Sequence, residues 1–238
     1  MRINILPLVI GVVAFGLCRD AEAITLASVD GFGATSEGWS IGATPSATQP
    51  TRSAGVGFDG QAGFLSHFSD SNGANGKWLM FSAQADWIGN YTSAGVSGIT
   101  FQADNQAGNP LAVRIAFSGP GGWFYSGAQT ITNSTGAADW TLLSYTLTSG
   151  SFTYLAGSGG TGSFTDTMSG VTRFEILGGA SAIVYHSNGN IIEAGLSTNT
   201  VGIDNITAVP EPATPGLLVV GWSAVAMMRR RRFIAAVR

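Results

Sequence analysis

Serine and histidine are the residues of this chain that most resemble a catalytic set, and their context argues against catalysis. Ser40 is the centre of a G-x-S-x-G match at residues 38–42. A serine hydrolase needs a strand, a sharp turn and then a helix at this pattern, whereas Pro45 and other turn residues follow here. The two histidines, His67 and His186, lie far apart in the sequence and have neither the context of a catalytic base nor the spacing of a metal pair.

Two further enzyme-like patterns are equally weak. Residues 157–162 match G-x-G-x-x-G but lack the βαβ setting of a dinucleotide site, so we expect a flexible loop. No closely spaced acidic pair stands on one predicted strand face, as two glycosidase carboxyls about 5–10 Å apart would require. The sequence therefore predicts a protein that is not an enzyme.

Aromatic side chains suggest binding instead. A flat ring packs against a sugar face while polar side chains bond the sugar hydroxyls. Trp123 and Tyr125 follow a glycine pair and could present their rings, and Trp87 and Tyr91 form a second candidate set. Arg114 points away from the apolar residues of its predicted strand and could contribute hydrogen bonds. The alternative is structural, because aromatic residues of a β-sandwich usually belong to its core.

Period-two alternation of apolar and polar residues predicts the elements that would position these side chains. The alternation is clearest at residues 111–117, and residues 164–168 could form one helical turn. The predicted strands cover residues 24–29, 63–68, 78–84, 99–104, 111–117, 123–132, 140–147, 173–176, 182–185 and 201–208. Short strands separated by Gly-, Asn- and Ser-rich turns predict an all-β fold, an antiparallel β-sandwich of the jelly-roll type.

The ends of the chain carry the signature of export. Residues 1–23 contain Arg2, an apolar stretch and a small-x-small site, which together indicate a signal peptide with the mature start at Ile24. Cys18, the only cysteine, leaves a lipoprotein as the alternative, although Leu17 precedes it where a small residue is preferred.

Between the two ends, residues 24–208 are long enough for one well-buried domain. This region has four basic and eleven acidic residues, a net charge of −7. Such an acidic surface argues against a nucleic-acid partner.

The C-terminal residues 209–238 have three parts in fixed order. Pro210, Glu211 and Pro212 precede an uncharged apolar run at residues 213–228. A basic cluster then follows, formed by Arg229, Arg230, Arg231 and Arg232. Sixteen apolar residues are short for a membrane span of about 20, and the arginines would hold the end of the chain in the cytoplasm. An ordinary tail anchor is the alternative to a processed signal.

This tail closely resembles the PEP-CTERM sorting signal of Gram-negative bacteria. The resemblance implies an exosortase-type processing protease as partner, a transient stay in the inner membrane through a short hydrophobic sorting helix, and delivery to the cell surface or extracellular matrix.

The domain has resemblances of its own. Residues 30–32 with Gly38 and Trp39 look like the opening of galactose-binding-like and laminin-B-like jelly rolls, residues 78–90 resemble a laminin B stretch, and residues 202–206 resemble the closing strand. In such families these domains bind glycans or serve as adhesive modules. The resemblance implies a structural calcium held by Asp204 with Asp30, or alternatively Glu37, since calcium prefers carboxylate and carbonyl oxygens.

Together these features predict an exported envelope or matrix protein that associates with glycan or exopolysaccharide in biofilm. A structural matrix protein with no small ligand is the first alternative. A secreted glycan-cleaving enzyme or esterase is the second.

Overall fold

The structure is a computed structural model. It describes residue 24 and residues 29–41, 50–58, 60, 62–69, 79–82, 84–106, 110–132, 140–179, 183–185, 191–193 and 199–211. The strands are β1 (Val29–Asp30), β2 (Ser40–Ile41), β3 (Thr51–Val56), β4 (Ala62–Ser69), β5 (Leu79–Ser82), β6 (Val96–Asn105), β7 (Leu111–Gly119), β8 (Gly122–Ser126), β9 (Gln129–Ile131), β10 (Thr141–Thr146), β11 (Phe152–Tyr154), β12 (Arg173–Gly178), β13 (Ile183–Tyr185), β14 (Ile191–Glu193) and β15 (Asn199–Pro210). The short helices are η1 (Ala85–Trp87), η2 (Ser149–Ser151) and α1 (Phe164–Met168).

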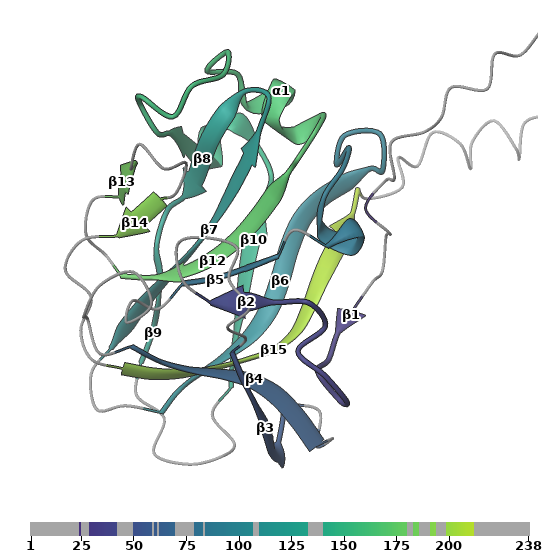
Figure 1. Ribbon diagram of the computed structural model, residues 1–238, viewed down its shortest axis with the longest axis vertical. Helices are drawn as coiled ribbons and strands as arrows, with labels where there is room; N and C mark the ends of the chain where they lie inside the picture. The colour runs from purple at the N-terminus through teal and green to yellow at the C-terminus, as the bar shows by residue number, and fades with distance from the viewer. Residues whose placement is uncertain are drawn as a thin grey trace, which may run out of the picture.

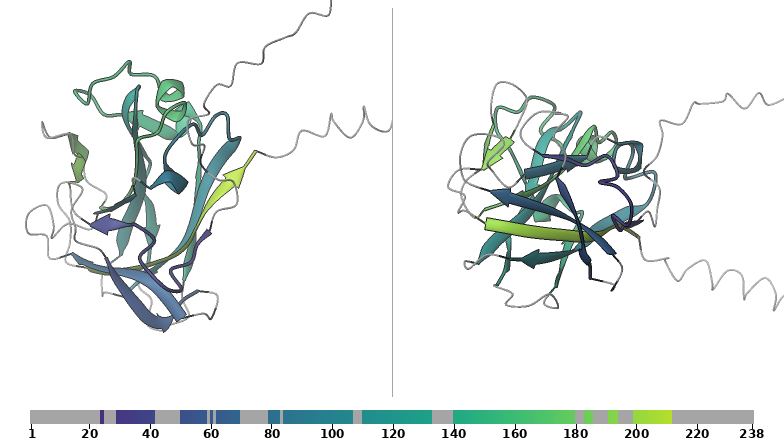
Figure 2. Two further views of the ribbon diagram at one scale, coloured as in Figure 1. Left: turned by 45° about the vertical axis from the view of Figure 1, so that its right-hand side comes forward. Right: turned by 60° about the horizontal axis from the view of Figure 1, so that its bottom comes forward.

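Two antiparallel sheets pack face to face (Figures 1 and 2). Sheet A has the strand order β10-β6-β15-β4-β3, with β1 beside β15. Sheet B has the order β11-β8-β7-β12-β5-β2, with β9 beside β7. The two strands β13 and β14 pair separately with each other. The predicted all-β sandwich is thus confirmed.

The core lies between the sheets and is built by the period-two alternation of the strands. On β7, Ile115 and Phe117 point inward and are fully buried, and their partners on β12 are Ile176 and Phe174. Phe117 and Phe174 stack with their ring centroids 5.0 Å apart. Ile24, the predicted first residue of the mature chain, also belongs to this core and is 2% exposed.

One carboxylate links the first strand to the core. Asp30 on β1 pairs with Ile206 of β15. Its Oδ2 accepts hydrogen bonds from the indole Nε1 of Trp39 at 2.7 Å and of Trp87 at 2.6 Å. Both tryptophan rings lie against Phe174, with centroids 5.5 and 5.3 Å away. Asp30 therefore satisfies two indoles that would otherwise be buried without an acceptor.

Several elements differ in detail from the prediction. The helical turn at α1 is confirmed, and Ser163 caps it by accepting a hydrogen bond from the backbone N–H of Asp166. Strands β2, β3, β11 and β14 were not expected. Strand β15 continues to Pro210, two residues beyond the predicted domain boundary at residue 208.

The predicted signal peptide at residues 1–23 and the sorting segment from Pro212 onward lie outside the described residues. Within the described ranges, no helix combines the length and the apolar character needed to cross a membrane.

We predict that Asp30→Ala strongly destabilises the domain. The substitution leaves two buried indole N–H groups without an acceptor, which costs about 1–3 kcal/mol for each group. Asp30→Asn keeps one side-chain oxygen and should cost less. Urea denaturation measures both changes. An Asp30→Ala variant within about 0.5 kcal/mol of the parent would contradict the assigned role of this carboxylate.

Candidate functional site

The outer face of sheet B, which points away from sheet A, brings three of the predicted binding residues together. Trp123 and Tyr125 lie on β8, where their partners on β7 are Ser118 and Ala116. Arg114 lies two residues from Ala116 on the same face of β7. The alternation of β7 and β8 explains this placement, since the intervening Ile115 and Phe124 point into the core.

An arginine guanidinium lies over the ring of Tyr125 and another over the ring of Trp123. The guanidinium carbon of Arg114 lies 5.8 Å from the ring centroid of Tyr125. That of Arg173, on β12, lies 5.8 Å from the ring centroid of Trp123. Arg114 also donates from Nε to the carbonyl oxygen of Gly179. Two ring–cation pairs on neighbouring strands form a semi-rigid surface of rings and hydrogen-bond donors.

A buried carboxyl group lies beside these pairs. Glu175 on β12 pairs with Ala116 and is fully buried. Its Oε1 lies 2.7 Å from Nε of Arg173, and within the described part of the chain its Oε2 has no hydrogen-bond partner. Burial raises the pKa of Glu175 to about 8, and the charge of Arg173 opposes the shift only in part. The loss of hydration of the Glu175 carboxylate raises its pKa more than the contact with Arg173 lowers it, because within the described residues Oε2 has no donor to stabilise its charge.

A second layer partly covers this face. Trp123 packs in a small apolar cluster with Leu155, Leu177 and Ile183, and only 4% of it is exposed. Strands β13 and β14 lie on the side of sheet B away from sheet A (Figures 1 and 2). Tyr125 and Arg114 are half-buried, so they are the part of the surface that a ligand can reach.

The second predicted aromatic set is wrong as a binding surface. Trp87 and Tyr91 are both 1% exposed and belong to the core between the sheets. Trp87 is fixed by its bond to Asp30, and the hydroxyl of Tyr91 donates to the carbonyl of Trp87. Rings held in this way cannot be offered to an external ligand.

Arg173 and Glu175 are the residues that sequence reasoning undervalued. In the sequence, Arg173 and Glu175 alternate with Phe174 and Ile176, which predicts that both charged side chains lie on the outer face as part of a solvated surface. The structure confirms the face but buries both residues. The usable signal was an arginine and a glutamate two residues apart on one face of a strand, where they can pair. Their burial depends on the layer above them, which the local pattern does not contain.

The predicted calcium residues lie near the first and last strands. Both oxygens of Asp204 accept backbone N–H groups, Oδ2 from Phe58 and Oδ1 from Asn205. Partial desolvation and the negative charge of Asp30 raise the pKa of Glu37, which lies at the surface, to about 7, so these acidic groups are close enough to interact. Among the described residues, however, no three His, Cys, Asp or Glu side chains are grouped as metal ligands. Calcium binding here stays a prediction.

The enzyme-like patterns gain no support from their surroundings. Ser40 belongs to β2 and pairs with Phe81 of β5, and residues 42–49, where a helix would have to begin, lie outside the described residues, as does His186. His67 is buried on β4. The glycine-rich segment after β11 packs on the turn between β7 and β8, where the N–H of Gly162 donates to the carbonyl of Gly121.

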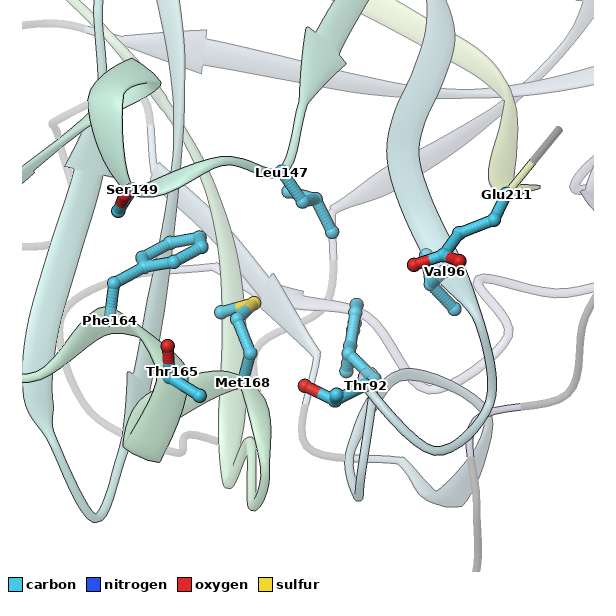
Figure 3. Close-up of a pocket in the computed structure, with 9 residues that line it drawn as sticks. Thr92, Val96, Leu147, Ser149, Phe164, Thr165, Met168 and Glu211 are labelled. Atoms are coloured by element: carbon cyan, nitrogen blue, oxygen red, sulfur yellow. The ribbon is translucent and has the colours of Figure 1, made fainter. Parts of the chain in front are cut away.

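Two concavities in the described structure are small. One of about 300 Å³ lies near Ser126, Ser144 and Phe152. The other, of about 260 Å³, lies beside α1 near Phe164 and Glu211 (Figure 3). Both volumes fall at or below the lower end of the range of about 300–1,000 Å³ for small-molecule sites.

No protein-family model and no curated protein sequence matches the chain. Among solved structures, an exo-β-agarase aligns with 80% of this chain and 25% of its own length, at a TM-score of 0.51 and 11% identity. A carbohydrate-binding module specific for non-crystalline cellulose aligns with 79% of this chain and 96% of its own, at a TM-score of 0.46 and 14% identity. The chain thus spans only a quarter of the agarase, and at this identity the likeness shows a shared fold alone.

We predict that stability falls as pH rises from about 5 to 9. The raised pKa of Glu175 means that the folded state favours the protonated acid, so its contribution is complete below its ordinary pKa and is lost as pH rises through about 8. Asp30 and Glu37 have raised pKa values and act in the same direction. The loss attributable to Glu175 is on the order of a few kcal/mol.

Glu175→Gln should flatten the upper part of this pH profile, because glutamine imitates the neutral acid. Thermal melts of both proteins across this pH range measure the effect. A melting temperature that rises toward pH 9 in the parent would show that the charged pair with Arg173 dominates, contrary to this account.

Calcium binding is tested by melting the chain in millimolar calcium and in chelator. A ligand that binds only the folded state stabilises it by about 2.7 kcal/mol at a hundred times its dissociation constant. We expect calcium to raise the melting temperature and Asp204→Ala to abolish the increase. Equal melting temperatures in calcium and in chelator would rule out this site.

Proposed function

We propose that this chain is an exported, non-catalytic protein whose β-sandwich associates with glycan at the cell surface or in the extracellular matrix. The observation that carries the proposal is the outer face of sheet B, where Tyr125 and Arg114 form an accessible ring–guanidinium pair. The partly covered pair of Trp123 and Arg173 lies beside it. A ring gives a sugar an apolar platform, and a guanidinium donates to hydroxyl or carboxyl oxygens.

Polysaccharides are the first class of ligand to test. An exo-β-agarase, as its name says, acts on a polysaccharide, and a quarter of that chain shares this fold. Association with exopolysaccharide in biofilm is the form of the proposal that suits an exported protein. A purely structural matrix protein with no small ligand is the alternative, and saturable binding separates the two.

The export part of the proposal rests on residues 1–23 and 209–238. A processing protease of the exosortase type would act at Pro210, Glu211 and Pro212 after the arginine cluster has stopped transfer in the inner membrane. The first two residues of this motif, Pro210 at the end of β15 and Glu211 after it, are hydrogen-bonded to the domain. The N–H of Glu211 donates to the carbonyl of Gly95 at 2.7 Å, and the hydroxyl of Ser97 donates to the carbonyl of Pro210 at 2.9 Å.

Glu211, the second residue of the motif, lines one of the two concavities. Its side chain lies beside Val96 and Thr92 at the concavity next to α1 (Figure 3). The first two residues of the motif are therefore attached to the domain. A protease that reads them in extended form would meet them at the edge of the fold.

We predict that Tyr125→Ala weakens binding of the full chain to insoluble polysaccharide about five- to tenfold, the equivalent of about 1–1.4 kcal/mol for one ring. Its melting temperature should change little, because the ring is on the outer face. Phe58→Ala is the matched control, since Phe58 is an aromatic residue 48% exposed outside this face. Equal binding by the Tyr125 variant and the control would argue against this surface.

We predict that replacing Pro210, Glu211 and Pro212 by alanine leaves a full-length precursor in the inner membrane. Ser97→Ala is the control, because it frees the Pro210 carbonyl without changing the motif, and processing should continue. Mass spectrometry of surface material measures both. An intact C-terminal Arg238 on the exported parent protein would refute processing and indicate a plain tail anchor.

A further inference from the structure

The outer face of sheet A, on the opposite side of the sandwich from the Tyr125 surface, also carries exposed apolar side chains. Phe68 on β4 is 55% exposed, and Leu142 on β10 is 59% exposed. Single exposed apolar residues need no explanation, but several on one face with unsatisfied polar groups mark an interaction surface.

Two aromatic rings lie between these residues on the same face. Phe64 of β4 and Trp140, just before β10, meet edge to face with centroids 5.3 Å apart. They meet over Gly202 of β15, where a Cβ atom would lie 3.1 Å from each ring. The absence of a side chain at Gly202 thus allows rings from two separate strands to join across the sheet. Trp140 is half-buried and keeps part of its ring accessible.

Hydrogen-bond acceptors without donors lie on the same face of β6. Asp104 pairs with Gly202, and Gln102 pairs with Leu142 on one side and Asp204 on the other. Gln102 is 8% and Asp104 is 6% exposed. Within the described part of the chain, Gln102 Oε1 and Asp104 Oδ1 accept no hydrogen bond, although the other oxygen of Asp104 accepts from Gln106 at 3.2 Å. Both acceptor atoms are buried. A buried acceptor left in this state costs about 1–3 kcal/mol, so a partner that displaces the side chains over these atoms and supplies donors gains that energy on binding.

The charges of this face restrict what the partner can be. Strands β4, β6, β10 and β15 contain no lysine or arginine. Arg52 of β3 pairs with Leu65, which faces the core, so it is not on the outer face. Asp104 and Asp204 make this face acidic. An anionic polymer is therefore disfavoured. A neutral chain of sugars supplies hydroxyl donors for the acceptors and C–H surfaces for the rings, without a charge of its own.

We infer that the outer face of sheet A is a second binding face, which takes a neutral polysaccharide chain. The inference rests on the proposed glycan association and extends it. Because the two faces are on opposite sides of one sandwich, a single domain joins two polysaccharide chains. In this way a small non-catalytic protein cross-links a matrix.

The test uses the full chain in mild detergent, with agarose beads and amorphous cellulose as neutral probes and alginate as an acidic one. Three changes address the second face. Leu142→Ser and Trp140→Ala remove apolar contacts. Gln102→Met removes the unsatisfied acceptor while preserving the shape of the side chain, so the free protein should be as stable as the parent or more stable.

In the Tyr125→Ala background each of these variants should lose about three- to tenfold of the remaining binding to a neutral probe, and in the parent each should retain the binding that depends on Tyr125. Combining Leu142→Ser with Tyr125→Ala should therefore give weaker binding than either single change. The parent protein should cross-link a soluble neutral polysaccharide, measured as an increase in viscosity. Variants of either single face should bind this polysaccharide without cross-linking it.

The outcomes separate the two proposals. Binding that Tyr125→Ala abolishes and that all three sheet A variants leave unchanged overturns the second face and leaves the proposed function intact. No binding of the parent to agarose, cellulose or alginate overturns both. Binding to alginate alone that Tyr125→Ala removes overturns the second face only. Alginate binding that the sheet A variants weaken, or a dimer of the chain that Leu142→Ser dissociates, overturns the assignment of a neutral polysaccharide to this face.

Discussion

The fold depends on a single carboxylate that accepts hydrogen bonds from two tryptophans. Asp30 belongs to a strand of two residues, too short to be held by its ladder alone. Its bonds to the indoles of Trp39 and Trp87 join β1, the segment before β2 and η1 at one point in the core. Because both indoles also pack on Phe174 of β12, this point connects sheet A to sheet B. One polar group thereby links the two sheets inside a largely apolar interior.

The core contacts do not involve the outer faces of the two sheets, and each outer face has aromatic rings and polar groups of its own. On sheet B, arginines lie over Trp123 and Tyr125, and burial raises the pKa of Glu175 well above its ordinary value. On sheet A, Phe64 and Trp140 meet across Gly202 beside acceptors that have no donor in the described structure. Buried polar groups without full pairing reduce stability. Among the described residues these groups lie on the outer faces of the two sheets, where we propose that ligands bind.

The sequence predicts the class of fold well because the relevant signal is local. Alternation on β7 identifies both the strand and its inward face, and the turn at α1 follows from Ser163 and its neighbours. Strand β3 was missed because Thr51–Val56 lacks alternation. Its position depends on non-local contacts, the pairing with β4 and the hydrogen bonds of Arg52 to the carbonyls of Phe32 and Gly33.

The site was predicted less well because burial is not local. Trp87 and Trp123 resemble each other as sequence features. Trp87 lies in the core between the sheets, where it donates to Asp30, a residue 57 positions away in the sequence. Trp123 lies on the outer face of sheet B and packs against Ile183 of β13. Arg173 and Glu175 were assigned to the correct face but to the wrong environment for the same reason.

A titration of the isotopically labelled chain with neutral oligosaccharides, followed residue by residue by NMR, tests the central claim most directly. Fast exchange is expected for a shallow surface of this kind. The account predicts that amide shifts concentrate on β7, β8 and β12 around Tyr125 and Ala116, with a second set on β6 and β10 at the outer face of sheet A, while the core amides around Trp39 and Trp87 stay unchanged. An absence of shifts at saturating sugar, or shifts confined to the loops at the ends of the sandwich, would contradict it.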